Sequence, residues 1–241
     1  TLNVAFMPAL VLTVLHTVFY AVRSATDEGL PVTKALLGSG EGVPFFSFML
    51  FESMLYAIGI AYITLAMVKE RAELRFKAAA FSDALTGAGN RRAFMLRGEK
   101  LLADCSRRQR STALLLCDLD HFKRLNDSFG HPMGDQALIA FSQMTRTMLR
   151  SGDVFARIGG EEFACLLADS DAAGAFEVAE RIRRGFAELD LLTPGFLSVS
   201  IGIVTTTAAG HDLSYLLSQA DQALYQAKAY GRNRVQVVAL A

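Results

Sequence analysis

The chain has 241 residues, 52% of them hydrophobic, with 24 basic and 24 acidic residues. This length fits one or two domains, and the balanced charge argues against a nucleic-acid partner, which would need a basic surface. The three cysteines are odd in number and lack the paired spacing of a disulfide framework or a zinc site, so they indicate small core residues in a reducing compartment.

Two long apolar segments come first, Val4–Val22 with about nineteen residues and Val43–Val68 with about twenty-six. Both are long enough to cross a bilayer, and a polar loop separates them. We therefore expect residues 1–68 to form a transmembrane helical hairpin with a short external loop. The chain starts at Thr1 without an initiating Met or a basic leader, so we expect the last two spans of a longer membrane sensor rather than a signal peptide.

Four basic residues follow the second apolar segment, and they are Lys69, Arg71, Arg75 and Lys77. The positive-inside rule therefore predicts a multi-pass protein of the inner (cytoplasmic) membrane, with everything after Val68 in the cytoplasm. His16 and Glu52 are polar groups within the spans, where such groups often have a sensing role. The alternatives are a helix–helix hydrogen bond for His16, and for Glu52 a place facing a missing helix or snorkelling. Residues 69–82 are expected to form a juxtamembrane signalling helix, with a solvated linker as the alternative.

The turn-rich segment Asp83–Arg92 marks the start of a second domain, residues 83–241. Helical and strand patterns then alternate. The expected elements are a helix Arg91–Arg108, a strand Thr112–Leu119, helices Phe122–Phe129 and Gly134–Leu149, a hairpin of Asp153–Ile158 and Phe163–Leu167, a helix Ala172–Leu189, a strand Leu197–Thr205, a helix Leu213–Tyr230 and a strand Val235–Leu240. This order predicts an α+β fold in which helices flank a mixed β-sheet.

The hairpin turn carries the segment Gly159-Gly160-Glu161-Glu162. A Gly-Gly pair between two apolar strands predicts a tight turn, because glycine reaches positive φ without a Cβ clash. The turn would present two carboxylates at its tip, one of which can bind a metal, with a solvated turn that is merely acidic as the alternative.

The strand Thr112–Leu119 leads into a second acidic pair, Asp118 and Asp120. Residues two apart share a strand face, so both could point towards the hairpin carboxylates. Mg²⁺ takes one or two protein carboxylates and completes its shell with water and substrate phosphate. This pattern predicts a Mg²⁺ or Mn²⁺ site, with simple capping of the strand end by the two aspartates as the alternative.

Polar residues after this strand suit a nucleotide. Lys123, at a helix start, can hold phosphate. Asn126 and Asp135 offer an amide and a carboxylate that together match a guanine edge. Lys228 and Arg232, four residues apart near a helix end, can form a second cationic clamp.

These segments, in this order and at these spacings, resemble a GGDEF diguanylate cyclase domain of the GGEEF variant. The resemblance covers about Asp83 to Val238. The segments that carry it are Gly159–Phe163, Asp118–Lys123, Asn126–Asp135, Asp83–Arg92 and Asp221–Asn233.

The resemblance implies a palm-like fold of the nucleotide cyclase and polymerase type. It implies condensation of two GTP into cyclic di-GMP and two pyrophosphates by a homodimer, with one GTP and two Mg²⁺ or Mn²⁺ ions per half-site. Metal binding would involve Asp118, the Leu119 carbonyl and Glu161. Catalysis would involve Glu161, Glu162 and Lys123. Substrate binding would involve Phe122, Lys123, Asn126, His131, Asp135, Lys228 and Arg232.

Arg150-Ser151-Gly152-Asp153 resembles the RxxD site through which cyclic di-GMP inhibits members of this family, and Arg181 lies where a further arginine completes that site. Two alternatives remain open. One is a non-catalytic receptor that binds GTP or cyclic di-GMP and only signals. The other is a mononucleotide cyclase on the same sheet, against which the Gly-Gly hairpin argues.

Overall fold

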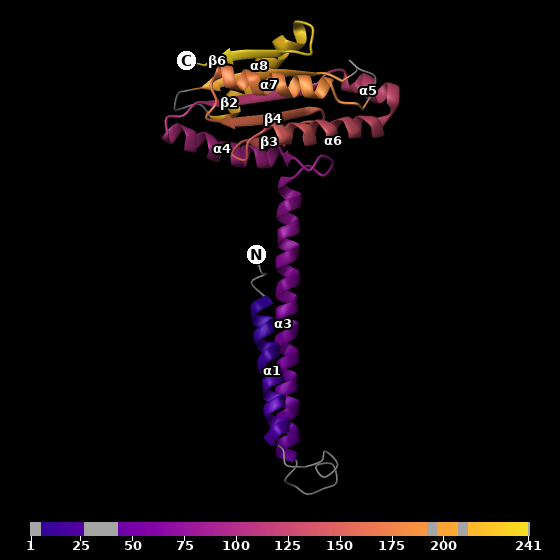
Figure 1. Cartoon of the computed structure of the whole chain (residues 1–241), viewed down its shortest axis with the longest axis vertical. Helices are drawn as coiled ribbons and strands as arrows, with labels where there is room; N and C mark the ends of the chain where they lie inside the picture. Colours follow the sequence, from indigo (N-terminus) through magenta and orange to yellow (C-terminus); the bar gives the residue numbers. More distant parts are fainter. Residues whose placement is uncertain (1–5, 27–42, 192–196, 207–211, 241) are drawn as a thin grey trace. The chain divides into compact units, whose positions relative to one another are not determined.

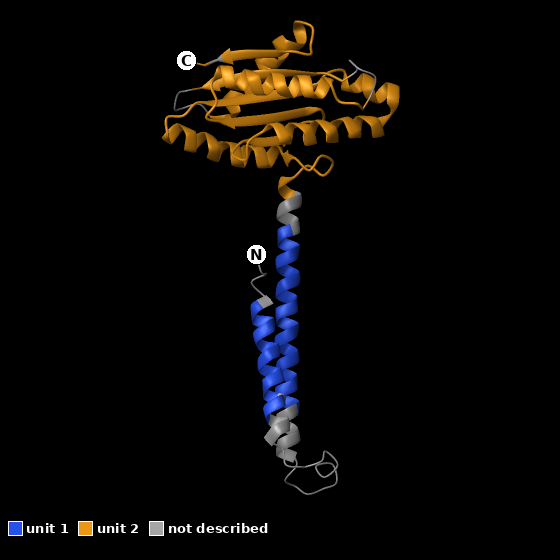
Figure 2. Ribbon diagram, in the orientation of Figure 1, with its two compact units in different colours: residues 1–77 blue, residues 78–241 orange. Residues whose placement is uncertain are grey.

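The computed structural model describes residues 6–26, 43–191, 197–206 and 212–240. It divides into two compact units, residues 1–77 and residues 78–241 (Figure 2). Each unit is described by itself. The predicted external loop lies largely outside the described residues.

The first unit contains helix α1 (Phe6–Thr26) and most of helix α3 (Val43–Phe81), which runs without interruption through the predicted juxtamembrane segment (Figure 1). Large apolar side chains on both helices are exposed, and they include Leu10, Val14, Leu15, Val18, Phe51, Leu55, Ile58 and Leu65. Within the described residues, one helical stretch, Leu50–Leu74, is long and apolar enough to cross a membrane, and the apolar part of α1, Met7–Phe19, is shorter. A two-span hairpin therefore stays a prediction.

The two polar side chains noted in the apolar segments contact each other. His16 Nδ1 lies 2.8 Å from Glu52 Oε1, and the His16 ring stacks on Tyr56 with 3.7 Å between ring centroids. The second carboxylate oxygen of Glu52 is buried and has no hydrogen-bond partner among the residues that the structure describes. Of the two roles considered from the sequence, the structure contains the interhelical hydrogen bond.

The second unit is built on a six-stranded mixed sheet (Figure 1). Its strands, in spatial order, are β1 (Gly89–Asn90), β3 (Val154–Arg157), β4 (Glu162–Ala168), β2 (Thr112–Leu119), β5 (Val199–Thr206) and β6 (Val235–Ala239). The central strands β4, β2 and β5 pair antiparallel, whereas β1 pairs with β3 and β5 with β6 in parallel. The predicted mixed sheet flanked by helices is confirmed.

Helices cover both faces of this sheet, which explains why its central strands read as continuous apolar runs. One core joins alternate residues of β2, β4 and β5 to α6 (His131–Met148) and α7 (Ala172–Ala187). The other core joins the intervening residues to α4 (Arg91–Arg107) and α8 (Leu213–Ala229). The short α5 (Phe122–Phe129) follows β2 and adds the buried Leu125 to the first core.

The element bounds differ from the predicted ones by a few residues at most positions. α6 begins at His131 instead of Gly134, because Pro132 sits in the first turn of the helix, where its missing N–H costs nothing. The two-residue strand β1 was not predicted, since so short a stretch has no periodicity. The three cysteines are free and buried, which confirms the expected small core residues.

Candidate active site

The hairpin turn between β3 and β4 is closed by the carbonyl of Glu162, which accepts hydrogen bonds from the N–H of Ile158 (2.9 Å) and of Gly159 (3.3 Å). The predicted reason for its glycines is wrong. Among the described residues, the glycines with positive φ are Gly87, Gly130 and Gly231. Gly159 is required for space, because a Cβ there would lie 2.2 Å from Oε2 of Glu162, whose carboxylate folds back over the turn.

The two acidic segments are neighbours in the sheet. Strand β2 pairs with β4 so that Asp118 stands opposite Glu162, and the Leu119 N–H donates to the Glu161 carbonyl at 3.2 Å. Asp118 and the two glutamates therefore meet at the same end of two adjacent strands. The expected convergence of the aspartate-ended strand and the double-glycine turn is found.

Burial makes this cluster electrostatically costly. Burial raises the pKa of Asp118, and the nearby Asp120 adds to the rise, while Lys228 and Arg232 oppose it. Burial, and then the charge of Asp118, raise the pKa of Glu161. Carboxylates held together in this way gain from a divalent cation, which neutralises them.

The donor set fits magnesium. Among the described residues, no group of three or more His, Cys, Asp or Glu side chains could hold a metal ion by itself. Mg²⁺ needs only one or two carboxylates, because water and substrate phosphate complete its shell. Asp118 and Glu161 could supply those carboxylates, with the Leu119 carbonyl as a third oxygen, so their metal-binding roles remain predictions.

Asp120 does not point at this cluster as the sequence suggested. Its buried carboxylate accepts hydrogen bonds from Ser198 Oγ (2.8 Å), Ser200 Oγ (2.7 Å) and the main-chain N–H of Asn233 (3.0 Å). Strand β2 ends at Leu119, so the alternation that would place Asp118 and Asp120 on one face stops before Asp120. Asp120 instead ties the loop after α8 to the start of β5.

The predicted guanine-reading residues lie on α5 and at the start of α6. Oδ1 of Asn126 is buried without a hydrogen-bond partner among the described residues, so it is an acceptor that a ligand N–H can satisfy. The glycine at position 134 leaves room for the Asn126 side chain, because a Cβ there would lie 1.9 Å from Asn126 Oδ1 and 3.1 Å from the Phe122 ring. Asp135 and His131 are exposed at the start of α6.

The predicted phosphate-binding cations differ in their surroundings. Lys123 is exposed on the first turn of α5. Lys228 is half-buried near the end of α8, with Nζ 2.8 Å from Asp118 Oδ2. Arg232 follows α8 in a left-handed conformation (φ 58°), and its positive charge acts to lower the pKa of Asp118.

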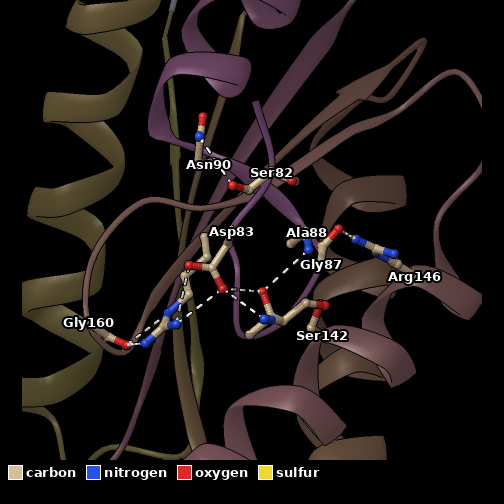
Figure 3. A network of polar contacts seen from close by, with 10 residues as sticks. Ser82, Asp83, Gly87, Ala88, Asn90, Ser142, Arg146 and Gly160 are labelled. Carbon is tan, nitrogen blue, oxygen red and sulfur yellow. Dashed lines mark hydrogen bonds and ion pairs between the residues drawn. The ribbon is translucent and has the colours of Figure 1, made fainter. Parts of the chain in front are cut away.

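Sequence reasoning missed the ion pair that supports the hairpin. The Arg157 guanidinium donates to the Gly160 carbonyl at the tip from Nε (3.1 Å) and Nη2 (2.6 Å) and to Asp83 Oδ1 from Nη1 (3.2 Å). Figure 3 shows the two partners, Gly160 and Asp83. Asp83 also accepts from the N–H and hydroxyl of Thr86. The turn after α3 is thereby joined to the hairpin. No local pattern marks this pair, because its partners are far apart in sequence.

The C-terminal end of α3 is hydrogen-bonded to Asn90, the residue before α4. Asn90 Nδ2 donates to the carbonyls of Ala80 (3.0 Å) and Ser82 (3.4 Å), and its Oδ1 caps the N-terminus of α4. Arg146 of α6 reaches the Gly87 carbonyl in the same turn (Figure 3). The turn from Asp83 to Asn90 is therefore fixed to β3, α4 and α6.

The RxxD residues and Arg181 line one cavity of about 620 Å³, which Arg110, Asp169 and Glu177 also line. Asp153 accepts from the N–H groups of Arg150 (2.9 Å) and Ala168 (3.2 Å), which fixes its carboxylate at the start of β3. Arg181 donates to the Met148 carbonyl at 2.7 Å. The residues that the sequence grouped into a second nucleotide site are thus brought together in space.

Three comparisons with known proteins bear on this site. Residues 80–234 match the family described as "Diguanylate cyclase, GGDEF domain". The chain is 36% identical over 184 residues to Probable diguanylate cyclase DgcC of Escherichia coli, a match that covers 75% of the chain and 49% of DgcC. It thus spans about half the length of this relative.

Solved structures agree with the fold. The coiled coil and GGDEF domain of DgcB from Caulobacter crescentus, in complex with c-di-GMP, is 26% identical with a TM-score of 0.70, over 77% of this chain and all (100%) of that one. The active GGEEF domain of a diguanylate cyclase from Vibrio cholerae is 31% identical with a TM-score of 0.59, over 63% of this chain and 98% of that one.

Proposed function

The chain belongs to the GGDEF family of diguanylate cyclases, and from that premise we propose that it condenses two GTP molecules into cyclic di-GMP and two pyrophosphates. The observation that carries the proposal is the pairing of β2 with β4, which brings Asp118 together with Glu161 and Glu162 at one strand end. The unsatisfied Asn126 Oδ1 supports guanine as the base, because it needs a donor such as the guanine N1–H or 2-amino group.

The chemistry proposed is nucleotidyl transfer. The 3′-hydroxyl of one GTP attacks the α-phosphorus of the other, a P–O bond forms, the bond between the α-phosphorus and the bridging oxygen to the β-phosphate breaks, and pyrophosphate leaves. Divalent cations held by Asp118, the Leu119 carbonyl and Glu161 would lower the pKa of the attacking hydroxyl and neutralise the leaving group. Lys123, Lys228 and Arg232 would bind the triphosphate.

A second transfer of the same kind closes the ring. One protomer offers one guanine-reading pair, Asn126 and Asp135, so it holds one GTP. Two protomers facing each other would bring the two nucleotides together, which makes a homodimer part of the proposal. Glu162, beside Glu161, would receive the proton that the attacking hydroxyl loses.

Two further features belong to the proposal. The exposed apolar side chains of α1 and α3 support a membrane anchor, with the second unit in the cytoplasm of an inner-membrane protein. The cavity at Arg150, Asp153 and Arg181 supports inhibition by cyclic di-GMP, because arginine pairs well with phosphate and with guanine edges.

The test is to incubate the full chain in detergent with GTP and Mg²⁺ and to identify the products by mass. Cyclic di-GMP, with pppGpG as the intermediate, is expected. Glu161→Ala should abolish turnover and retain nucleotide binding, and Glu99→Ala, an exposed position on α4, is the control. A dimeric protein that binds GTP without turnover would favour a non-catalytic receptor. A cyclic mononucleotide as the product would favour a mononucleotide cyclase.

A further inference from the structure

Two residues that the sequence assigned to different partners are paired with each other. Asp118 was expected to bind metal and Lys228 to bind phosphate, yet Lys228 Nζ lies 2.8 Å from Asp118 Oδ2. The Asp118 side chain is only 7% exposed and that of Lys228 is 33% exposed. The ammonium group therefore sits on an oxygen of the carboxylate that the proposed function assigns to the metal.

Tertiary contacts on both sides hold Lys228 in this place. On one side, α8 packs tightly against β5 at Gly202, where a Cβ would lie 2.2 Å from the Ala220 carbonyl oxygen. On the other side, the loop after α8 is anchored by the hydrogen bond from Asn233 N–H to Asp120. The pairing of Lys228 with Asp118 is therefore built into the position of α8 and is not a chance contact of a surface lysine.

We propose that Lys228 is a built-in competitor for the metal, which a divalent cation and the GTP triphosphate displace together. The inference rests on the proposed function. Asp118 has acceptor sites for both cations, since Lys228 contacts only Oδ2, but two cations on one carboxylate repel each other, so Lys228 and Mg²⁺ weaken each other's binding to Asp118. The triphosphate supplies the anionic partner that Lys228 takes up when it leaves Asp118.

Metal and nucleotide binding are then coupled. The divalent cation alone binds against the repulsion of the Lys228 ammonium group, and the triphosphate alone must draw Lys228 away and leave Asp118 buried and uncompensated. Bound together, they compensate both groups, and the coupling acts equally in both directions. Lys228 thereby weakens the binding of divalent cations to the cluster until substrate is present.

The experiment uses the full chain in detergent and Mn²⁺ as the probe, with free Mn²⁺ measured by electron paramagnetic resonance. Titrations are made without nucleotide and with a non-hydrolysable GTP analogue. Lys228→Met should bind Mn²⁺ alone about five- to tenfold more tightly than the unmodified chain, and the enhancement of Mn²⁺ binding by the analogue should shrink by a similar factor. Lys228→Arg keeps a cation beside Asp118 and should restore weak binding of Mn²⁺ alone.

Lys123→Met is the matched control, because Lys123 is also a proposed phosphate ligand but lies on α5. It should weaken binding of the analogue without tightening Mn²⁺ binding. Far-UV circular dichroism confirms that each variant is folded. Mn²⁺ binding alone that is unchanged or weaker in Lys228→Met, including no binding in either protein, overturns the inference. Failure of the unmodified chain to make cyclic di-GMP overturns the proposed function separately, since Mn²⁺ titration needs no turnover.

Discussion

Replacing Asp120 by alanine tests whether this carboxylate is a structural anchor or a metal ligand. In the structure it accepts three hydrogen bonds, from two serine hydroxyls and one main-chain N–H, and it is 7% exposed. A hydrogen bond to a charged group contributes about 1.5–3 kcal/mol, and a buried donor left without a partner costs about 1–3 kcal/mol. The substitution also removes a charge that is costly to bury, which offsets part of the lost stability.

We therefore expect Asp120→Ala to lower the free energy of unfolding by about 3 kcal/mol, the upper end of the usual range for single substitutions. For a chain of this size, each kcal/mol moves Tm by about 2–4 °C, so the expected decrease is about 6–12 °C. Thermal unfolding of the full chain in detergent, followed by circular dichroism, measures it. The control Glu99→Ala changes an exposed carboxylate on α4 and should change stability by no more than about 0.5 kcal/mol.

The same variant is titrated with Mn²⁺ well below its Tm. If Asp120 is an anchor, Asp120→Ala keeps measurable Mn²⁺ binding, whereas Asp118→Ala loses a direct ligand. An unchanged Tm together with complete loss of Mn²⁺ binding would refute the anchoring role and return Asp120 to the metal site.

Three further predictions follow from the same structure. Gly134→Ala places a methyl group 1.9 Å from Asn126 Oδ1, so it should weaken binding of a GTP analogue by isothermal calorimetry while Mn²⁺ binding alone is retained; equal binding would contradict the guanine assignment. The pKa of Asp83 is lowered because hydrogen bonds from Thr86 and the Arg157 charge outweigh its burial, so this stabilisation is present above the ordinary pKa near 3.8 and lost as the pH falls through the lowered value. Asp83→Asn should therefore be less stable than the unmodified chain at pH 7 in urea unfolding, and the difference should shrink below about pH 4; a constant difference would count against the ion pair. Titration with a thiol reagent should detect no fast-reacting thiol in the native chain and all three after unfolding, and rapid native labelling would contradict their burial; the thiols are Cys105, Cys117 and Cys165.

Local sequence was sufficient for much of the fold. Period-two and period-3.6 patterns predicted the long helices and the central strands, because burial of one face imposes the spacing of apolar residues within each element. The same patterns placed Asp118 at a strand end and Glu161 in a turn. The prediction that Asp118 and Glu161 lie close together assumed that the strand ending at Asp118 is a neighbour of the hairpin, and the pairing of β2 with β4 confirms this.

Two expectations about the site were wrong, each for its own reason. Asp120 was expected to share a face with Asp118, but strand β2 ends between them. Its carboxylate instead accepts hydrogen bonds from Ser198 just before β5, from Ser200 in β5 and from Asn233 in the loop after α8. Gly159 seemed to need positive φ, but its constraint is the folded-back Glu162 carboxylate. Each depends on atoms that are remote in sequence or on a side-chain direction that residue type does not specify.

The sequence by itself determined where the helices and the longer strands lie and which residue types stand at their ends, since the spacing of apolar residues along the chain records which face of each element is buried. Only the tertiary structure decided that Arg157 joins Asp83 to the hairpin tip and that Lys228 pairs with Asp118. Charged side chains can pair with any opposite charge that the fold brings near, so their partners are set by how the elements pack and not by the order of residues along the chain.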